Sequence, residues 1–117
     1  ALNQLIASLT HGYSLALRLV QSSGLDVDCF MEVLRPSALY APTVDKKLER
    51  MMSHQYDDPN FSTSLLRKDL QLFLREARLA GVNATALEGL ASLLERADGT
   101  DLDAGDYSAL HELTDGR

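Results

Sequence analysis

The sequence predicts an all-α fold, a compact bundle of five to six helices, on three observations. Apolar residues recur at three- and four-residue spacing in several separate segments of the 117-residue chain. Glycine, proline, Asn and Asp residues separate those segments, and no segment reads as a strand. The connections are short, which favours antiparallel packing of neighbouring helices. A chain of this length is expected to form one domain with a single core.

The first helix is expected from the start of the chain to about Ser22, closed by Gly24 in the left-handed conformation. Apolar residues are in helical phase from Leu2 onward, and no capping side chain stands before Ala1. We therefore expect a truncated helix whose N-terminal part precedes this chain. Its apolar residues lie on more than one face, which predicts burial on most sides and self-association. They are Leu2, Leu5, Ile6, Leu9, Leu15, Leu17, Leu19 and Val20.

Two further helices are expected before a loop over residues 56–60. Asp26 is the predicted N-cap of the second helix, which ends at about Leu34 because Pro36 follows closely. The third helix is expected over Pro42–Ser53. Its predicted inward residues are Val44, Leu48, Met51 and Met52. Its predicted outward residues are Asp45, Lys46, Lys47, Glu49 and Arg50.

The rest of the chain divides at residues that start or stop helices. The expected segments are a helix over 62–80, a helix from 83 or 85 to about 97, a loop over 98–101 and a short helix over about 104–113. Ser62 or Asn60 caps the first of these helices and Gly81 ends it. Asn83 or Thr85 caps the second.

Lys68 occupies an unusual position in the helix over residues 62–80. The apolar stripe of this helix comprises Leu65, Leu66, Leu70, Phe73, Leu74 and Ala77. Lys68 stands three residues after Leu65 and four before Leu72, at the flank of the stripe, and Asp69 follows it. An ionisable pair against an apolar face is costly unless each charge has a partner. Lys68 therefore either snorkels or pairs, or points into a cleft that holds an anion.

Composition excludes several classes of function. The 17 acidic and 11 basic residues give a net charge of −6, and no basic cluster is present, so nucleic acids and anionic membranes are not expected partners. No apolar run is long enough to span a bilayer. Cys29 is the only cysteine, so neither an intrachain disulfide nor a cysteine-based zinc site is expected. We expect Cys29 to be a small core residue and the chain to be cytoplasmic.

The histidines and serines of the sequence show no known catalytic or metal-binding pattern. His11, His54 and His111 share no metal-ligand spacing, so no metal site is expected. We expect His54 and His111 to be exposed. No Gly-x-Ser-x-Gly elbow, Ser–His pair or glycine-rich phosphate loop is apparent.

Three motifs resemble one known family. The pattern F-x-x-x-L-x-x-K-D, here from Phe61 to Asp69, resembles the cofactor-contacting helix in the C-terminal domain of the β-hydroxyacid dehydrogenases. This family includes 3-hydroxyisobutyrate dehydrogenase, tartronate semialdehyde reductase and glyoxylate reductase, within the 6-phosphogluconate dehydrogenase superfamily. Ala-Leu-Asn at residues 1–3, followed by an apolar helix and by Gly-Leu-Asp at residues 24–26, resembles the family's long interdomain helix. Asp-Tyr-Ser-Ala-Leu at residues 106–110 is similar to its closing helix.

The resemblance implies that residues 1–117 are a helical C-terminal substrate and dimerisation domain, with the N-terminal Rossmann domain outside this chain. It implies NAD or NADP in the full-length protein and none bound by this chain alone, a homodimer, and hydride transfer on a short hydroxy acid. Lys68 is implied to bind cofactor, and Asn3, Phe61 and Asp69 to bind substrate. The catalytic lysine of the family, four residues before the asparagine, is expected just before Ala1, so no catalytic residue lies in this chain.

Each implied role has a structural alternative. Asn3 is otherwise an exposed residue at a frayed end, Phe61 a core residue, and Asp69 a partner that orients Lys68. The alternative function is a helical dimerisation module of a catalytically inactive dehydrogenase-like protein. The residue four positions before Asn3 distinguishes the two functions, so the sequence leaves open whether the full-length protein is an enzyme.

Overall fold

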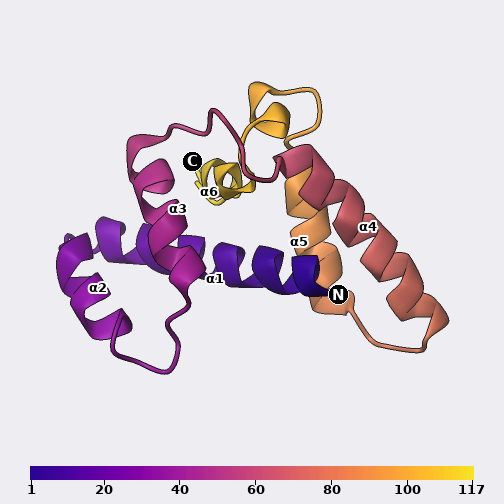
Figure 1. Ribbon diagram of the computed structural model, residues 1–117, viewed down its shortest axis with the longest axis horizontal. Helices are drawn as coiled ribbons and strands as arrows, with labels where there is room; N and C mark the ends of the chain where they lie inside the picture. The colour runs from indigo at the N-terminus through magenta and orange to yellow at the C-terminus, as the bar shows by residue number, and fades with distance from the viewer.

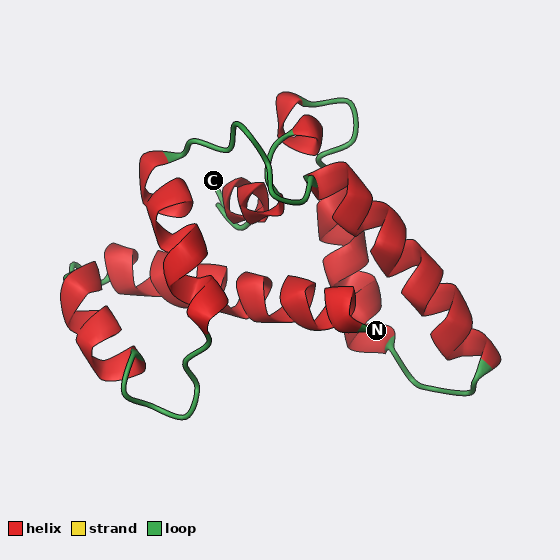
Figure 2. Ribbon diagram, viewed as in Figure 1, coloured by secondary structure: helices red, strands yellow, loops and turns green.

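The computed structural model describes residues 1–117 and confirms the all-α fold. The helices are α1 (Leu2–Ser22), α2 (Val27–Leu34), α3 (Pro42–Ser53), α4 (Thr63–Leu79), α5 (Thr85–Glu95) and α6 (Leu110–Leu113), with 3-10 helices η1 (Asp101–Ala104) and η2 (Tyr107–Ala109). No strand forms, as Figure 2 shows, and β pairing is limited to an isolated bridge between Ser62 and Asp106. None of the helices is long and apolar enough to cross a membrane.

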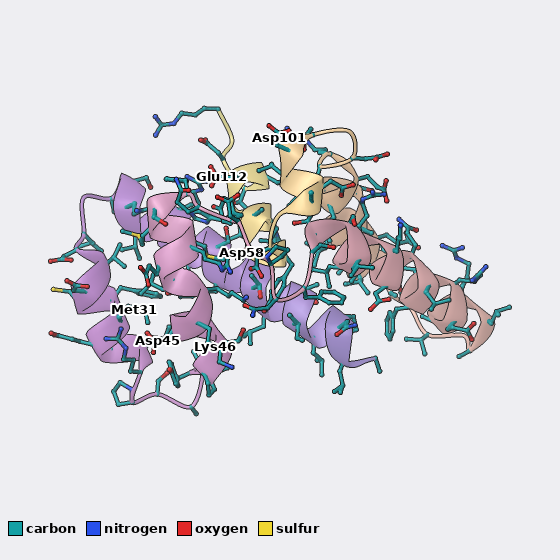
Figure 3. All side chains as sticks on the ribbon, turned by 45° about the horizontal axis from the view of Figure 1, so that its top comes forward. Met31, Asp45, Lys46, Asp58, Asp101 and Glu112 are labelled. Atoms are coloured by element: carbon teal, nitrogen blue, oxygen red, sulfur yellow. The ribbon has the colours of Figure 1, made fainter.

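Helix α1 is the axis on which the other helices are arranged (Figure 1). Helices α4 and α5 lie at its N-terminal end, and α2 and α3 lie along its C-terminal part (Figure 1). The buried apolar residues accordingly form two clusters. The large core comprises Ala7, Leu66, Leu70, Leu74, Leu90, Ala91, Leu94, Tyr107 and Leu110. The small core comprises Tyr13, Leu17, Met31, Val44 and Met51, with Met31 lying between α2 and α3 in Figure 3.

Local capping places most of the helix ends where the sequence predicts them. Asp26 Oδ1 accepts a hydrogen bond from the Asp28 backbone N–H at 2.9 Å, which caps α2. Ser62 Oγ accepts from the Leu65 backbone N–H at 3.2 Å, which caps α4. Gly24 ends α1 with φ of 75°, a left-handed value that favours glycine. These positions depend on residues close in sequence, which explains why they were predictable.

The start of α5 and the last segment differ from the predictions. Ala84 is the N-cap residue of α5 and provides no side-chain cap, while Asn83 Oδ1, one residue earlier, accepts from the Thr85 backbone N–H at 3.1 Å. The prediction of a single helix over residues 104–113 is wrong. The chain is extended at Gly105 and Asp106, where ψ is 171° and 146°, so this segment divides into η1, η2 and α6. Helix η1 also begins inside the predicted loop.

Four predictions of burial in α2, α3 and α6 are wrong. Cys29 is exposed, because the short helix α2 buries only Met31 fully. Met52 is 44% exposed and Lys47 is 5% exposed, because the buried stripe of α3 is Val44, Lys47 and Met51 at three- and four-residue spacing. His111 is 2% exposed, because α6 packs against α1.

Candidate functional site

Asn3 and Asp69 meet where the first turn of α1 crosses α4. The Asn3 side-chain amide donates a hydrogen bond from Nδ2 to Asp69 Oδ2, and both residues are half-buried. This bond holds the first turn of α1 against α4. It uses one of the two Nδ2 hydrogens, so the other hydrogen and the Oδ1 acceptor of Asn3 remain available to a ligand.

Phe61 lies at the start of α4, in edge-on contact with Tyr107. Their ring centroids are 6.4 Å apart and the rings are inclined by 68°, a favourable T-shaped geometry. Phe61 is half-buried and packs against the large core, while the Tyr107 hydroxyl lies 3.2 Å from Thr43 Oγ1. Phe61 therefore joins the large core to a polar region near α3.

Lys68 lies on the exposed side of α4. The buried residues of this helix are Thr63, Leu66, Leu70, Leu74 and Ala77. Leu65, which the predicted stripe includes, and Leu72, which it does not, are 49% and 50% exposed, so the prediction for Leu65 is wrong. Lys68 is itself exposed and lines a shallow surface with Arg75 and Arg78. The fold thus joins Asn3 to Asp69 and places Lys68 on the adjacent exposed face, with its charge free of any ion pair in the chain.

A buried ion pair between Lys47 and Asp106 is the main polar feature that sequence reasoning missed. Lys47 Nζ lies 3.1 Å from both Asp106 carboxylate oxygens and 3.3 Å from Asn60 Oδ1. It also lies 4.6 Å from the centre of the Tyr107 ring, in cation–π geometry. Side-chain exposure is 6% for Lys47 and 0% for Asp106. The pair joins α3 to the segment that precedes η2.

The remaining lone pairs of Asp106 are also satisfied. The carboxylate accepts from the Ser108 hydroxyl at 2.6 Å and from the backbone N–H groups of Ser108 and Asn60, each at 3.1 Å. Burial acts to raise the pKa of Asp106, but the hydrogen bonds from Ser108 and the charge of Lys47 outweigh it, so the pKa lies below its ordinary value. The motif Asp-x-Ser is a local signal for this capping role. No local signal identifies Lys47, which is 59 residues away.

A cleft opens beside this ion pair, between α1 and α3. Its lining residues are Ile6, Thr43, Lys46, Lys47, Arg50, Asn60 and Tyr107, and its volume is about 660 Å³. Three of these residues are cations from α3, and none is acidic. Lys46 and Asp45 are labelled on α3 in Figure 3. Asp45 is engaged away from the cleft by Arg35, at 3.0 Å.

Ser14 and His111 form a second polar group, in the contact between α1 and α6. Ser14 Oγ lies 2.7 Å from His111 Nδ1, and both side chains are buried. Burial, together with the charge of Arg18, lowers the pKa of His111 to about 4. A buried Ser–His pair has no access to a substrate, so this contact is structural. The sequence did not predict it because the two residues are 97 positions apart.

Glu112 forms a separate surface cluster on α6 (Figure 3). Its carboxylate accepts from the Tyr56 hydroxyl at 2.7 Å and lies 2.8 Å from His54 Nδ1. No group of three or more His, Cys, Asp or Glu side chains in the chain has the arrangement of a metal site.

Comparisons with known proteins give a family and a fold. The family described as NAD-binding of NADP-dependent 3-hydroxyisobutyrate dehydrogenase matches residues 1–114. The chain is also similar to the crystal structure of a 3-hydroxyisobutyrate dehydrogenase from Salmonella typhimurium, with a TM-score of 0.79 and 18% sequence identity. This match covers 96% of the present chain and 39% of the other, so the chain spans well under half the length of that protein. A comparison with curated proteins found no match.

Proposed function

We propose, since this chain belongs to the NAD-binding family of NADP-dependent 3-hydroxyisobutyrate dehydrogenase, that it serves as the C-terminal domain of an NAD(P)-dependent oxidoreductase acting on a short hydroxy acid. The family match over residues 1–114 carries this proposal. The hydrogen bond between Asn3 and Asp69 supports it, because it prepares an amide at the N-terminal end of α1, where the family motif implies a substrate contact.

Asn3 is the substrate-binding residue in this proposal. Asp69 fixes the rotation of the Asn3 amide by accepting from Nδ2. The free N–H then donates to the substrate carboxylate or hydroxyl, and Oδ1 accepts from a hydroxyl. A preoriented amide of this kind costs less ordering entropy when substrate binds. Phe61, half-buried nearby, shapes the apolar side of the same site.

Lys68 suits one edge of a bound dinucleotide. It is an exposed cation on a helix face that also exposes Leu65 and Leu72, a combination that fits a phosphate or ribose edge beside a flat ring. The nicotinamide supplies the hydride chemistry when it is bound in the full-length protein. We propose that this domain closes over the nicotinamide, with a lysine preceding Asn3 moving the proton at the alcohol oxygen.

We also propose that the chain forms a homodimer through α1. Five leucines of this helix are exposed by 38% to 75%: Leu2, Leu5, Leu9, Leu15 and Leu19. An exposed surface that carries several large apolar side chains often marks a contact surface. A second copy and the Rossmann domain are the proposed partners. Sedimentation equilibrium at micromolar concentration should show a dimer that Leu5→Asp and Leu9→Asp dissociate, and a purely monomeric wild type would contradict the proposed dimer.

The test of the proposed activity uses the full-length protein. We expect reduction of NAD⁺ or NADP⁺ with 3-hydroxyisobutyrate or another short hydroxy acid, and a fall in kcat/KM of about 10²-fold in Asn3→Ala, whose missing amide orients substrate. Absence of turnover with every short hydroxy acid would favour the second function, a dimerisation module without activity. The exposed leucines of α1 are the observation that supports this second function.

A further inference from the structure

The cleft between α1 and α3 is lined by three cations and enclosed by several segments of the chain. Two surfaces of the chain are lined by three cations and no carboxylate, the face of α4 around Lys68 and this cleft. The α4 surface is the side of a single exposed helix. The cleft instead has walls from α1, α3 and the Tyr107 segment, and it has hydroxyl and amide groups besides its cations. Such a concentration of positive charge is notable in a chain whose net charge is −6.

Lys46 is the cation that remains free for a ligand. Lys47 is satisfied by Asp106, Asn60 and the Tyr107 ring. Arg50 donates to the backbone carbonyls of Asp57 and Asp58 at 2.6 and 2.8 Å. Lys46 is exposed, and no carboxylate in the chain pairs with it.

The N-terminal part of α3 adds to the positive potential of the cleft. Thr43 lies in the first turn of this helix, where Ala41 provides no side-chain cap. Backbone N–H groups in a first helical turn favour an anion, and the Thr43 hydroxyl is a further donor. Lys47 and Arg50 lie one helical turn or more further on, where the Asp106 carboxylate, 3.1 Å from Lys47 Nζ and 4.0 Å from Arg50 Nε, balances part of their charge.

The cleft adjoins the substrate residues on two sides. Ile6 lines the cleft and follows Asn3 by three residues of α1, a rise of about 4.5 Å. Tyr107 lines it as well and contacts Phe61. A molecule with its reacting end at Asn3 therefore reaches the cleft by extending roughly one helical turn along α1.

We propose that this cleft receives a second anionic group of the substrate, and that Lys46 is the residue that selects for it. The inference rests on the proposed function and narrows its substrate class to hydroxy acids with a distal carboxylate or phosphate. Lys46 contacts the distal anion together with Thr43, while Lys47 and Arg50 line the cleft in positions fixed by their own partners.

The first test measures binding to the 117-residue chain by amide chemical shifts. Malate and 3-phosphoglycerate, which carry a second anionic group, are titrated alongside 3-hydroxyisobutyrate and NADP⁺. We expect saturable shifts in residues 43–50 with the first two compounds, and no such shifts with 3-hydroxyisobutyrate. Lys46→Ala should abolish these shifts, whereas Arg96→Ala, which removes an exposed cation just after the end of α5, should retain them.

Three results of this titration would overturn the inference. They are the absence of saturable shifts in residues 43–50, shifts there that persist in Lys46→Ala, and shifts there with NADP⁺ but with neither acid, which would assign the cleft to a cofactor phosphate. Malate and 3-phosphoglycerate distinguish carboxylate from phosphate as the preferred group. Because this test needs no catalysis, its outcome is independent of whether the protein proves to be a dehydrogenase.

The second test uses kinetics of the full-length protein. Lys46→Ala should raise KM for the hydroxy diacid about tenfold, the effect of one charge-assisted contact at a partly exposed site, and leave KM for 3-hydroxyisobutyrate within about twofold. An equal change for both substrates would contradict a selecting role for Lys46 while leaving the proposed activity intact.

Discussion

This chain contains two lysine–aspartate combinations, of which the one adjacent in sequence is not paired and the one distant in sequence is. Lys68 and Asp69 are adjacent in sequence, yet Asp69 binds Asn3 and Lys68 faces solvent. Lys47 and Asp106 are 59 residues apart, yet they form a buried ion pair at 3.1 Å. Successive residues of a helix point about 100° apart, so they do not face each other. Proximity in the sequence therefore gave no guide to which charges pair.

The two lysines also differ in their expected roles, since Lys47 stabilises the fold and Lys68 is free to bind a ligand. The Lys47–Asp106 pair is desolvated and fully hydrogen-bonded, and it ties α3 to the segment before η2. The loss of either partner leaves an uncompensated buried charge. The Lys68 side chain needs no charged partner in the fold, because water solvates it. A residue that the fold does not require is available for binding, which fits its proposed contact with a dinucleotide.

The largest expected effect is on the buried pair. Lys47→Ala should lower the free energy of unfolding by about 3–5 kcal/mol, because buried Asp106 then keeps only the more distant Arg50, whose Nε lies 4.0 Å away. Urea denaturation followed by circular dichroism measures this change, with Lys46→Ala as the control on the next residue, expected within about 0.5 kcal/mol of wild type. A loss below about 1 kcal/mol in Lys47→Ala would show that the pair does not support the fold.

His111 is a buried group that the fold keeps neutral, in contrast to the charged Lys47 and Asp106. Its pKa of about 4 lies below the ordinary value of 6.5, so the unfolded chain binds a proton more readily than the folded chain. Stability is then complete above about pH 6.5 and falls as the pH decreases toward 4, by roughly 2–3 kcal/mol. Urea midpoints between pH 7 and 4 measure the slope. His111→Gln, which keeps a hydrogen-bonding group for Ser14, should have a smaller slope, and an equal slope in both proteins would exclude His111 as its source.

A smaller effect on stability, with an effect on kinetics, is expected at Lys68. Lys68→Ala should change the free energy of unfolding by less than about 0.5 kcal/mol, since the side chain is exposed. In the full-length protein it should raise KM for the dinucleotide or lower turnover, because a cation near the cofactor is lost. Reduced thermal stability with unchanged kinetics would contradict the proposed cofactor contact and show that Lys68 is a structural residue.

The smallest expected signal is binding of NADPH to the isolated chain. Lys68 offers one charged contact, which contributes about 1.5–3 kcal/mol at most and does not offset the freedom lost on binding. A dinucleotide site also needs a helix N-terminus and backbone donors around the pyrophosphate, which we propose lie in the Rossmann domain of the full-length protein. NADPH fluorescence should therefore show no saturation at low micromolar concentration. Saturable binding at low micromolar concentration would show that the main cofactor site lies in this domain.

The sequence by itself determined where most helices begin and end. Asp26, Ser62 and Gly24 act within a few residues of their own position, so their roles do not depend on the rest of the fold. The order of the three motifs likewise identified the family, because a motif is a property of the linear chain. The division of residues 104–113 was less predictable, because Gly105 is extended where its backbone carbonyl accepts from Thr63 N–H at 2.8 Å.

Only the tertiary structure decided which polar residues are buried together. Lys47 and His111 look like surface residues from their residue types, although the spacing of Val44, Lys47 and Met51 places Lys47 on the buried stripe of α3. Their burial follows from the packing of α3 and α6 around α1, which brings Asp106 to Lys47 and Ser14 to His111. The same packing forms the cleft beside Lys46 from residues of α1, α3 and the Tyr107 segment. Helix boundaries depend on local backbone hydrogen bonds, whereas buried pairs and clefts depend on contacts between distant segments, which exist only once the chain has folded.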